Sequence, residues 1–198
     1  MKVAYPLRGG IMNDRMRAQL DMITYNTESN YDKVLCKILS EITEISDSTP
    51  ADWYTEDAEY WQKGLFTGCY NADRKIIYLN SCVLDFIALA GTLYHETGHH
   101  ILHCADFIEV DKWNKLLDKL IILSDYALWE RYKLEPYSMT NIYELFCDIW
   151  ALVCLQKYKF YAELAICHLI ELFDSVGLNL PELIDKIEQH YLGEQSII

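Results

Sequence analysis

The stretch of sequence that decides the fold is GTLYHETGHHILHC, residues 91–104. It holds four of the chain's six histidines within nine positions, together with one glutamate. Its apolar residues favour a helix, and on a helix His95 and His99 lie on one face with a rise of about 6 Å between them. His100 lies about 100° away from that face, toward solvent or the sheet.

Two imidazoles one turn apart can bind the same metal ion, and a carboxylate beside them can act as a base. In this H-E-x-x-H pattern, neutral His95 and His99 bind Zn²⁺, which acidifies a water molecule, and Glu96 accepts its proton. With six histidines and fifteen glutamates in 198 residues, about 0.01 chance matches are expected. The stretch therefore predicts a catalytic site with one zinc ion per chain rather than a helix turn with incidental histidines.

A catalytic zinc ion usually has three protein ligands and one open position, so a third ligand is needed. In NIYELFCDIWALVCL, residues 141–155, Glu144 and Asp148 lie one helical turn apart among apolar residues. Unpaired carboxylates are costly on a mostly buried helix, and a zinc ion with its histidine would pair with both. We predict that Glu144 is the third ligand and that Asp148 accepts the N–H of a ligand imidazole.

Other third ligands stay open. The two carboxylates can exchange roles, with Asp148 on the metal. His103 continues the spacing, but three ligands on one straight helix face cannot surround a tetrahedral ion, and no glycine follows His99 to turn the chain. Cys104 and Cys147 are further candidates, although cysteines in apolar surroundings are more often packed core thiols.

Composition and charge narrow the class of protein. The chain has a net charge of −13, 52% hydrophobic residues, and seven cysteines. An acidic surface repels nucleic acid and anionic membranes, so we expect neither as a partner and expect a protein or peptide substrate instead. Scattered cysteines without a CxxC pair, and the lack of a signal-peptide pattern or long apolar run, favour a cytoplasmic protein. Nothing in the sequence predicts an oligomeric state.

The rest of the sequence predicts a mostly helical α+β fold with one small antiparallel sheet. An irregular start precedes a helix over 28–46, and a hairpin over 64–80 has its best strand at Lys75–Asn80. Ser81 can cap a long helix over 82–104. The later helices are expected over 107–133 with a break near Ser124, from a cap at Ser138 or Thr140 to Lys157, onward to Phe173 with Gly177 as a stop, and from Asn179 to Leu192.

We expect one domain, 1–198, made of four consecutive parts. These are an N-terminal helical part, the hairpin with the HExxH helix, a helical insertion, and C-terminal helices with the third ligand, over residues 28–63, 64–105, 106–137 and 138–198.

The stretch IIYLNSCVLDFIALAGTLYHETGHHILH, residues 76–103, resembles the active-site region of the ImmA/IrrE-type metallopeptidases. In that family a strand ending in Asn precedes a helix with H-E-L-G-H; Thr97 stands here where Leu is usual. YELFCDIWALVCL, residues 143–155, resembles the family's acidic helix, in which a Glu completes the zinc site. The resemblance covers about residues 64–105 and 140–156. It implies a zincin-like (minigluzincin) fold, intracellular proteolysis and often a transcriptional repressor as the target.

The sequence therefore predicts an intracellular zinc-dependent endopeptidase, a hydrolase that cleaves a protein such as a regulator or repressor. The strand Lys75–Asn80 is expected to line the cleft and to pair with extended substrate. Its candidate cleft residues, with one from the acidic helix, are Ile76, Ile77, Tyr78 and Tyr143. The alternative is a zinc-stabilised protein-binding module with the same fold and no proteolytic role, and the intact Glu96 argues against it. A deformylase is disfavoured because the TGCYN context of Cys69 does not match its cysteine ligand.

Overall fold

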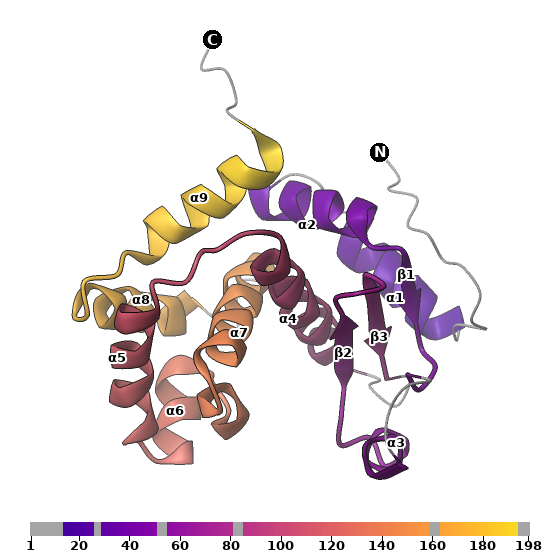
Figure 1. The fold of residues 1–198 in the computed structure, drawn as a ribbon, viewed down its shortest axis with the longest axis horizontal. Helices are drawn as coiled ribbons and strands as arrows, with labels where there is room; N and C mark the ends of the chain where they lie inside the picture. The colour runs from indigo at the N-terminus through magenta and orange to yellow at the C-terminus, as the bar shows by residue number, and fades with distance from the viewer. Residues whose placement is uncertain (1–13, 26–28, 51–54, 81–84, 159–162, 194–198) are drawn as a thin grey trace. The chain divides into compact units, whose positions relative to one another are not determined.

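The computed structural model describes residues 14–25, 29–50, 55–80, 85–158 and 163–193 (Figure 1). Helices dominate these residues and one small sheet accompanies them, which confirms the α+β class. The chain divides into two compact units, 1–100 and 101–198, and the boundary falls within helix α4 (Phe86–Cys104). The single domain over 1–198 stays a prediction.

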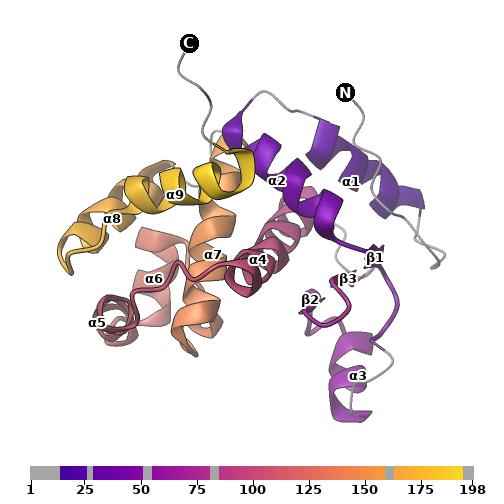
Figure 2. The ribbon, with the colours of Figure 1, turned by 45° about the horizontal axis from the view of Figure 1, so that its top comes forward.

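The first unit contains the sheet and the histidine-rich helix. Its elements in chain order are α1 (Asp14–Tyr25), α2 (Asn30–Glu41), β1 (Glu44–Ser46), α3 (Thr55–Gln62), β2 (Gly68–Asn71), β3 (Ile76–Leu79) and most of α4. Figures 1 and 2 show the sheet between α2 and α3, with β2 beside α4.

The three strands are ordered β1-β3-β2, so β3 is the central strand. β2 pairs antiparallel with β3, from Gly68 opposite Leu79 to Asn71 opposite Ile76, which confirms the predicted hairpin. β1 pairs with β3 in parallel, with Glu44 opposite Ile76. The sheet is therefore mixed, and the prediction of a purely antiparallel sheet is wrong.

The predicted helix over 28–46 is too long at its end. Ser29 caps its start by accepting the N–H of Asp32, and its hydroxyl donates to the Asp32 carboxylate at 2.8 Å. The helix stops at Glu41, because Ile42 is extended with φ −73° and ψ 132°. Ile42, Thr43 and Ile45 are β-branched and suit a strand better than a helix, and β1 begins at Glu44.

Two other helix starts differ from the prediction. Helix α1 lies in a segment predicted to be irregular, where it buries an apolar stripe formed by Met16, Leu20 and Ile23. Helix α4 begins at Phe86 rather than near residue 82, because the Asp85 carboxylate accepts the N–H groups of the first turn. The predicted cap Ser81 lies outside the described residues.

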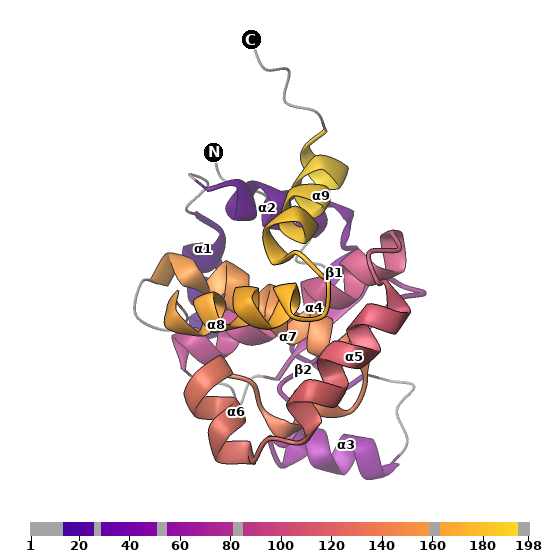
Figure 3. The same cartoon turned by 90° about the vertical axis from the view of Figure 1, so that its left-hand side faces the viewer.

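The regular elements of the second unit are all helical in its described residues, and Figure 3 shows α5, α6 and α8 on the side toward the viewer. Its elements are α5 (Val110–Ile121), α6 (Asp125–Tyr132), the 3₁₀ turn η1 (Pro136–Met139), α7 (Ile142–Leu155), the 3₁₀ turn η2 (Gln156–Tyr158), α8 (Glu163–Asp174) and α9 (Leu180–Leu192). The predicted break at Ser124 and the predicted cap at Asn179 are confirmed by their side-chain bonds to Ala127 N–H and Glu182 N–H.

Helix α7 is buried along most of its length and forms the core of this unit. Its cap is Asn141, whose side chain accepts the N–H groups of Tyr143 and Glu144 at 2.9 and 3.0 Å. The predicted cap, Ser138 or Thr140, is therefore wrong. An aromatic cluster joins the helix to α5 and α8, with ring centroids of Trp113 at 5.7 Å from Phe146 and 5.5 Å from Phe173.

Candidate metal centre

His95 and His99 on helix α4 point toward a common position. Their Nε2 atoms are 3.2 Å apart, and their rings are inclined by 72° with centroids 5.0 Å apart. Both side chains are half-buried. Two imidazole nitrogens so placed can share one N–H hydrogen bond, and they can equally bind one cation. The structure thus brings together the two nitrogens that the helical spacing predicts.

The donor chemistry of the described residues suits a metal ion. Histidine, cysteine and glutamate side chains form groups whose nitrogen, sulfur and oxygen atoms lie within 4.8 Å of one another. Imidazole, thiolate and carboxylate groups are the usual protein ligands of divalent transition metals. The chain therefore contains groups that can hold a metal ion.

Glu96 lies on the side of α4 that faces strand β2. Its side chain is buried, with 5% of the residue exposed. A Cβ atom at Gly68 would lie 2.7 Å from the Glu96 carboxylate oxygen Oε1 and 2.5 Å from the methyl carbon of Thr92. Because such distances are too short, only glycine at position 68 allows the strand to approach this face of the helix so closely.

Thr97 is buried in α4 where the resembling family has Leu. Its hydroxyl donates to the backbone oxygen of Tyr94 at 2.7 Å, within the same helix. The hydroxyl therefore has a hydrogen-bond partner in apolar surroundings, so Thr in place of Leu at position 97 leaves no buried polar group unsatisfied.

His100 is completely buried, with 0% of the residue exposed. Its Nδ1 lies 2.8 Å from the Tyr70 hydroxyl on β2, and its Nε2 lies 3.1 Å from the Glu41 carboxylate at the end of α2. The sheet-facing orientation predicted for His100 is confirmed, and the solvent-facing one is wrong. No local sequence signal indicates these partners, since Glu41 precedes His100 by 59 positions.

The two carboxylates of α7 lie in the second unit. Glu144 and Asp148 are half-buried on a helix whose other residues are mostly buried, as predicted. The Ser138 hydroxyl donates to the Asp148 carboxylate, and it also accepts the N–H of Glu135. The ligand role of Glu144 and the imidazole-orienting role of Asp148 stay predictions.

The predicted pairing of substrate with the strand Lys75–Asn80 is wrong. β3 has β1 along one edge and β2 along the other, so its backbone groups are already used. Ile77 and Tyr78 are buried, and Ile76 is half-buried. In the described sheet, β2 is the edge strand that lies beside α4. Of the four predicted cleft residues, Tyr143 is the one with a largely exposed side chain.

His103 and His168 differ in their exposure and contacts. His103 is exposed at the end of α4. His168 on α8 lies 3.8 Å from the Glu171 carboxylate. None of the six described cysteines forms a disulfide, and Cys82 lies outside the described residues. Among the described helices, none is both long and apolar enough to cross a membrane.

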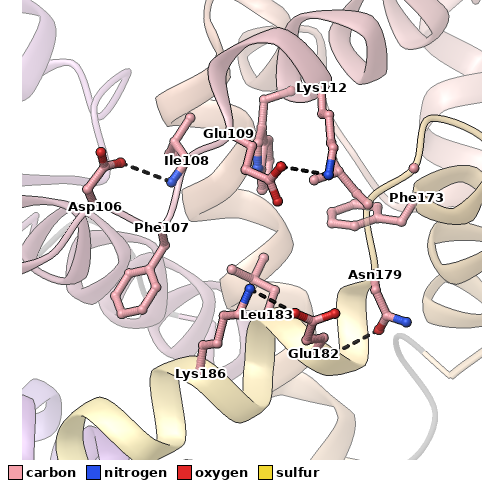
Figure 4. Close-up of a pocket in the computed structure, with 13 residues that line it drawn as sticks. Asp106, Phe107, Ile108, Glu109, Lys112, Phe173, Asn179, Glu182, Leu183 and Lys186 are labelled. Atoms are coloured by element: carbon pink, nitrogen blue, oxygen red, sulfur yellow. Dashed lines mark hydrogen bonds and ion pairs between the residues drawn. The ribbon is translucent and has the colours of Figure 1, made fainter.

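A pocket of about 350 Å³ opens in the second unit between the start of α5 and the start of α9 (Figure 4). Its rim carries two ion pairs, Lys112 with Glu109 at 2.6 Å and Lys186 with Glu182 at 2.8 Å. The hydrogen bond and charge of Lys186 lower the pKa of Glu182, and Glu182 in turn raises the pKa of Lys186. These charges are paired with one another, as in a solvated network of surface ion pairs.

Comparison with family models, with curated proteins and with solved structures finds no match for this chain. The resemblance to the ImmA/IrrE-type metallopeptidases therefore depends on the motifs around the two histidines and on α7.

Proposed function

We propose that this protein is a zinc-dependent endopeptidase with a zincin-like fold. The observation that carries the proposal is the convergence of the His95 and His99 Nε2 atoms, 3.2 Å apart, next to a buried carboxylate, Glu96. Two histidines alone would serve a structural metal site equally well. A glutamate beside the first histidine, held against a strand, is the additional group that hydrolysis of a peptide bond requires.

The ligand set of the proposed site fits zinc. His95 and His99 would hold the ion from α4, and Glu144 from α7 is the proposed third ligand, because two imidazoles and one carboxylate form a common catalytic set. When bound, zinc polarises a carbonyl oxygen and makes a water molecule more acidic. Asp148 is proposed to orient a ligand imidazole, and the Ser138 hydroxyl holds that carboxylate in place.

Glu96 is proposed to move the protons of the reaction. It accepts a proton from the attacking water and returns it to the amine that leaves. Gly68 allows β2 to lie against the Glu96 side chain, which limits the positions that the carboxylate can occupy. A general base that is held in one position is more often oriented correctly for proton transfer.

The edge strand β2 is the proposed binding site for the main chain of the substrate. An extended peptide can add to an edge strand through backbone hydrogen bonds, and this strand lies beside the helix of the proposed base. The chain carries a net charge of −13, which favours neutral or basic polypeptides, and regulatory proteins are the proposed class.

The experiment that tests the function is Glu96→Gln in zinc-loaded protein, with a proteome-derived peptide library as substrate and mass spectrometry as readout. Gln keeps the size of the side chain but removes the base, so cleavage is expected to fall by about 10²- to 10⁴-fold. Zinc content is expected to stay at one ion per chain. Glu130→Gln, at an exposed position on α6, is the control and is expected to keep full activity.

A different outcome would favour the zinc-stabilised binding module. That outcome is a wild-type protein that binds zinc, cleaves no peptide and has the same binding partners as Glu96→Gln. Proteolysis would then not be the function of this site.

A further inference from the structure

Strand β2 and helix α4 contact each other at two successive points. Gly68 lies against Thr92 and Glu96, and two residues later Tyr70 lies against His100. Residues i and i+2 of a strand point to the same face about 6.6 Å apart, and residues i and i+4 of a helix are separated by about 6 Å. The strand and the helix therefore advance together, with two strand residues to each turn of the helix.

His100 joins three elements at the second contact. Its Nδ1 meets Tyr70 of β2 at 2.8 Å, and its Nε2 meets Glu41 of α2 at 3.1 Å. A carboxylate only accepts, so Nε2 carries the hydrogen and donates to Glu41. In that tautomer Nδ1 is an acceptor, and the Tyr70 hydroxyl donates to it. The three groups form one hydrogen-bonded chain with a single consistent direction.

We propose that His100 is a positioning residue that fixes the register of β2 on α4. Glu41 orients the imidazole, the imidazole holds Tyr70, and this bond keeps Gly68 opposite Glu96. The consequence for catalysis rests on the proposed function, in which β2 receives the substrate beside the general base. The register itself does not depend on that function.

The burial of His100 makes the bond to Tyr70 hard to replace. If the Tyr70 hydroxyl is removed, the buried Nδ1 of His100 has no water molecule that could replace it as a donor. The packing of β2 on α4 therefore becomes less stable. Loss of the bond is expected to let β2 move away from α4, and a displaced edge strand binds extended peptide less tightly. We therefore expect weaker substrate binding with an unchanged metal site.

Three substitutions separate the two bonds of the imidazole. Tyr70→Phe removes only the hydroxyl. His100→Gln places an amide where Nε2 was and keeps a partner for Glu41, whereas His100→Asn places one where Nδ1 was and keeps a partner for Tyr70. His100→Gln is expected to behave like Tyr70→Phe, and His100→Asn to keep most of the wild-type behaviour. The double variant Tyr70→Phe/His100→Gln is expected to be no worse than either single variant.

The first readout is hydrogen exchange of the backbone amides of residues 68–71 in the full-length protein without substrate. In Tyr70→Phe, protection of these amides is expected to fall by about 5- to 100-fold, while the amides of α9 keep theirs. Tyr126→Phe is the matched control, because Tyr126 is 75% exposed on α6. It is expected to leave every amide of β2 unchanged.

The second readout is the division between KM and kcat for the fastest-cleaved peptide of the library. Tyr70→Phe is expected to raise KM with little change in kcat or zinc content. His100→Asn is expected to keep a lower KM than His100→Gln. If His100→Gln does not fold, Tyr70→Phe and His100→Asn carry the same test.

The proposal is overturned if the β2 amides keep wild-type protection in Tyr70→Phe, or if the effects of Tyr70→Phe and His100→Gln simply add. It is also overturned if a second zinc ion binds to the wild type and is lost in Glu41→Gln, since Glu41 and His100 would then be metal ligands. Failure of the wild type to cleave any peptide would refute the proposed function alone, because hydrogen exchange needs no substrate.

Discussion

Gly68 on strand β2 and Glu96 on helix α4 meet where no side chain larger than hydrogen fits. A Cβ atom at position 68 would lie 2.7 Å from the Glu96 Oε1 atom, closer than carbon and oxygen can pack. The proposed general base is therefore covered by strand backbone on one side, which leaves its carboxylate few positions to adopt. The identity of residue 68 thus bears on both stability and the proposed chemistry.

Gly68→Ala is expected to push β2 away from α4. The new methyl group meets Thr92 Cγ2 at 2.5 Å and Glu96 Oε1 at 2.7 Å, so the strand or the side chains must move. Overpacking of this kind costs about 1–3 kcal/mol of unfolding free energy, measurable by urea denaturation. In the proposed enzyme, cleavage is expected to fall together with stability.

A second-site variant checks that this loss is steric. Thr92→Ser removes the Cγ2 carbon that the new methyl group would meet, so Gly68→Ala/Thr92→Ser is expected to regain part of the lost stability. Equal stability of the single and double variants would show that Thr92 does not limit the approach of the strand.

Zinc binding is expected to require both histidines of the converging pair. His95→Ala and His99→Ala each remove one of two nitrogens that lie 3.2 Å apart, so each is expected to lose the metal. His168→Ala, on α8, is the control and is expected to keep one zinc per chain. Elemental analysis measures the zinc content. A chelator is expected to lower the Tm of the wild type and of His168→Ala but not that of the two α4 variants, because bound metal stabilises the folded state. Zinc retained in both α4 variants would contradict the proposed site.

The sequence predicts the parts of the fold that depend on local signals. The hairpin is recognisable from two short apolar runs around a polar turn, and the start of α9 from the cap Asn179. β1 is missed because its partner, Ile76, lies 32 positions after Glu44, and a parallel pair across such a distance leaves no local pattern. Helix α1 is missed because its buried apolar stripe depends on Met16, Leu20 and Ile23, and so few apolar positions give a weak periodic signal.

The same division holds at the candidate site. The convergence of His95 and His99 follows from the four-residue period of a helix and needs nothing else. The contact of Gly68 with Glu96 depends on the packing of strand on helix, and position 68 looks in the sequence like any hairpin glycine. The central place of β3 likewise follows from its pairing with β1, which the sequence does not reveal.

Asn80 is expected to be important for stability rather than for chemistry. It is 2% exposed, and its side-chain amide donates to the backbone oxygens of Trp61 and Phe66, both at 2.7 Å. Asn80→Leu leaves these oxygens without that donor, so unfolding free energy is expected to fall by about 2–4 kcal/mol in urea denaturation. Asn114→Leu, at an exposed position of α5, is the control and is expected to change it by less than about 0.5 kcal/mol.

Asn80→Asp tests whether the stability depends on the N–H donors of the Asn80 side chain or only on its size. The carboxylate has the same shape but turns an acceptor toward two acceptors, so it is expected to destabilise the protein at least as much as Leu at neutral pH. Wild-type stability of Asn80→Asp would show that the two hydrogen bonds contribute little.

Glu144 and Asp148 are expected to affect the metal to different degrees. Glu144→Gln removes the proposed charged ligand, so zinc affinity and thermal stability are expected to fall together. Asp148→Asn changes only the group that orients an imidazole, and a loss of about 10- to 100-fold in affinity or activity is expected. Ser138→Ala removes a hydroxyl that donates to Asp148 and is expected to have a smaller effect in the same direction.

Zinc titration of the three variants decides which carboxylate is the ligand. Normal affinity in Glu144→Gln with a severe loss in Asp148→Asn would reverse the two roles. Normal affinity in both would exclude the carboxylates and leave His103, Cys104 and Cys147, which His103→Ala and the two Cys→Ser variants would then separate. We expect Glu144, because two imidazoles and one carboxylate form a common ligand set of catalytic zinc.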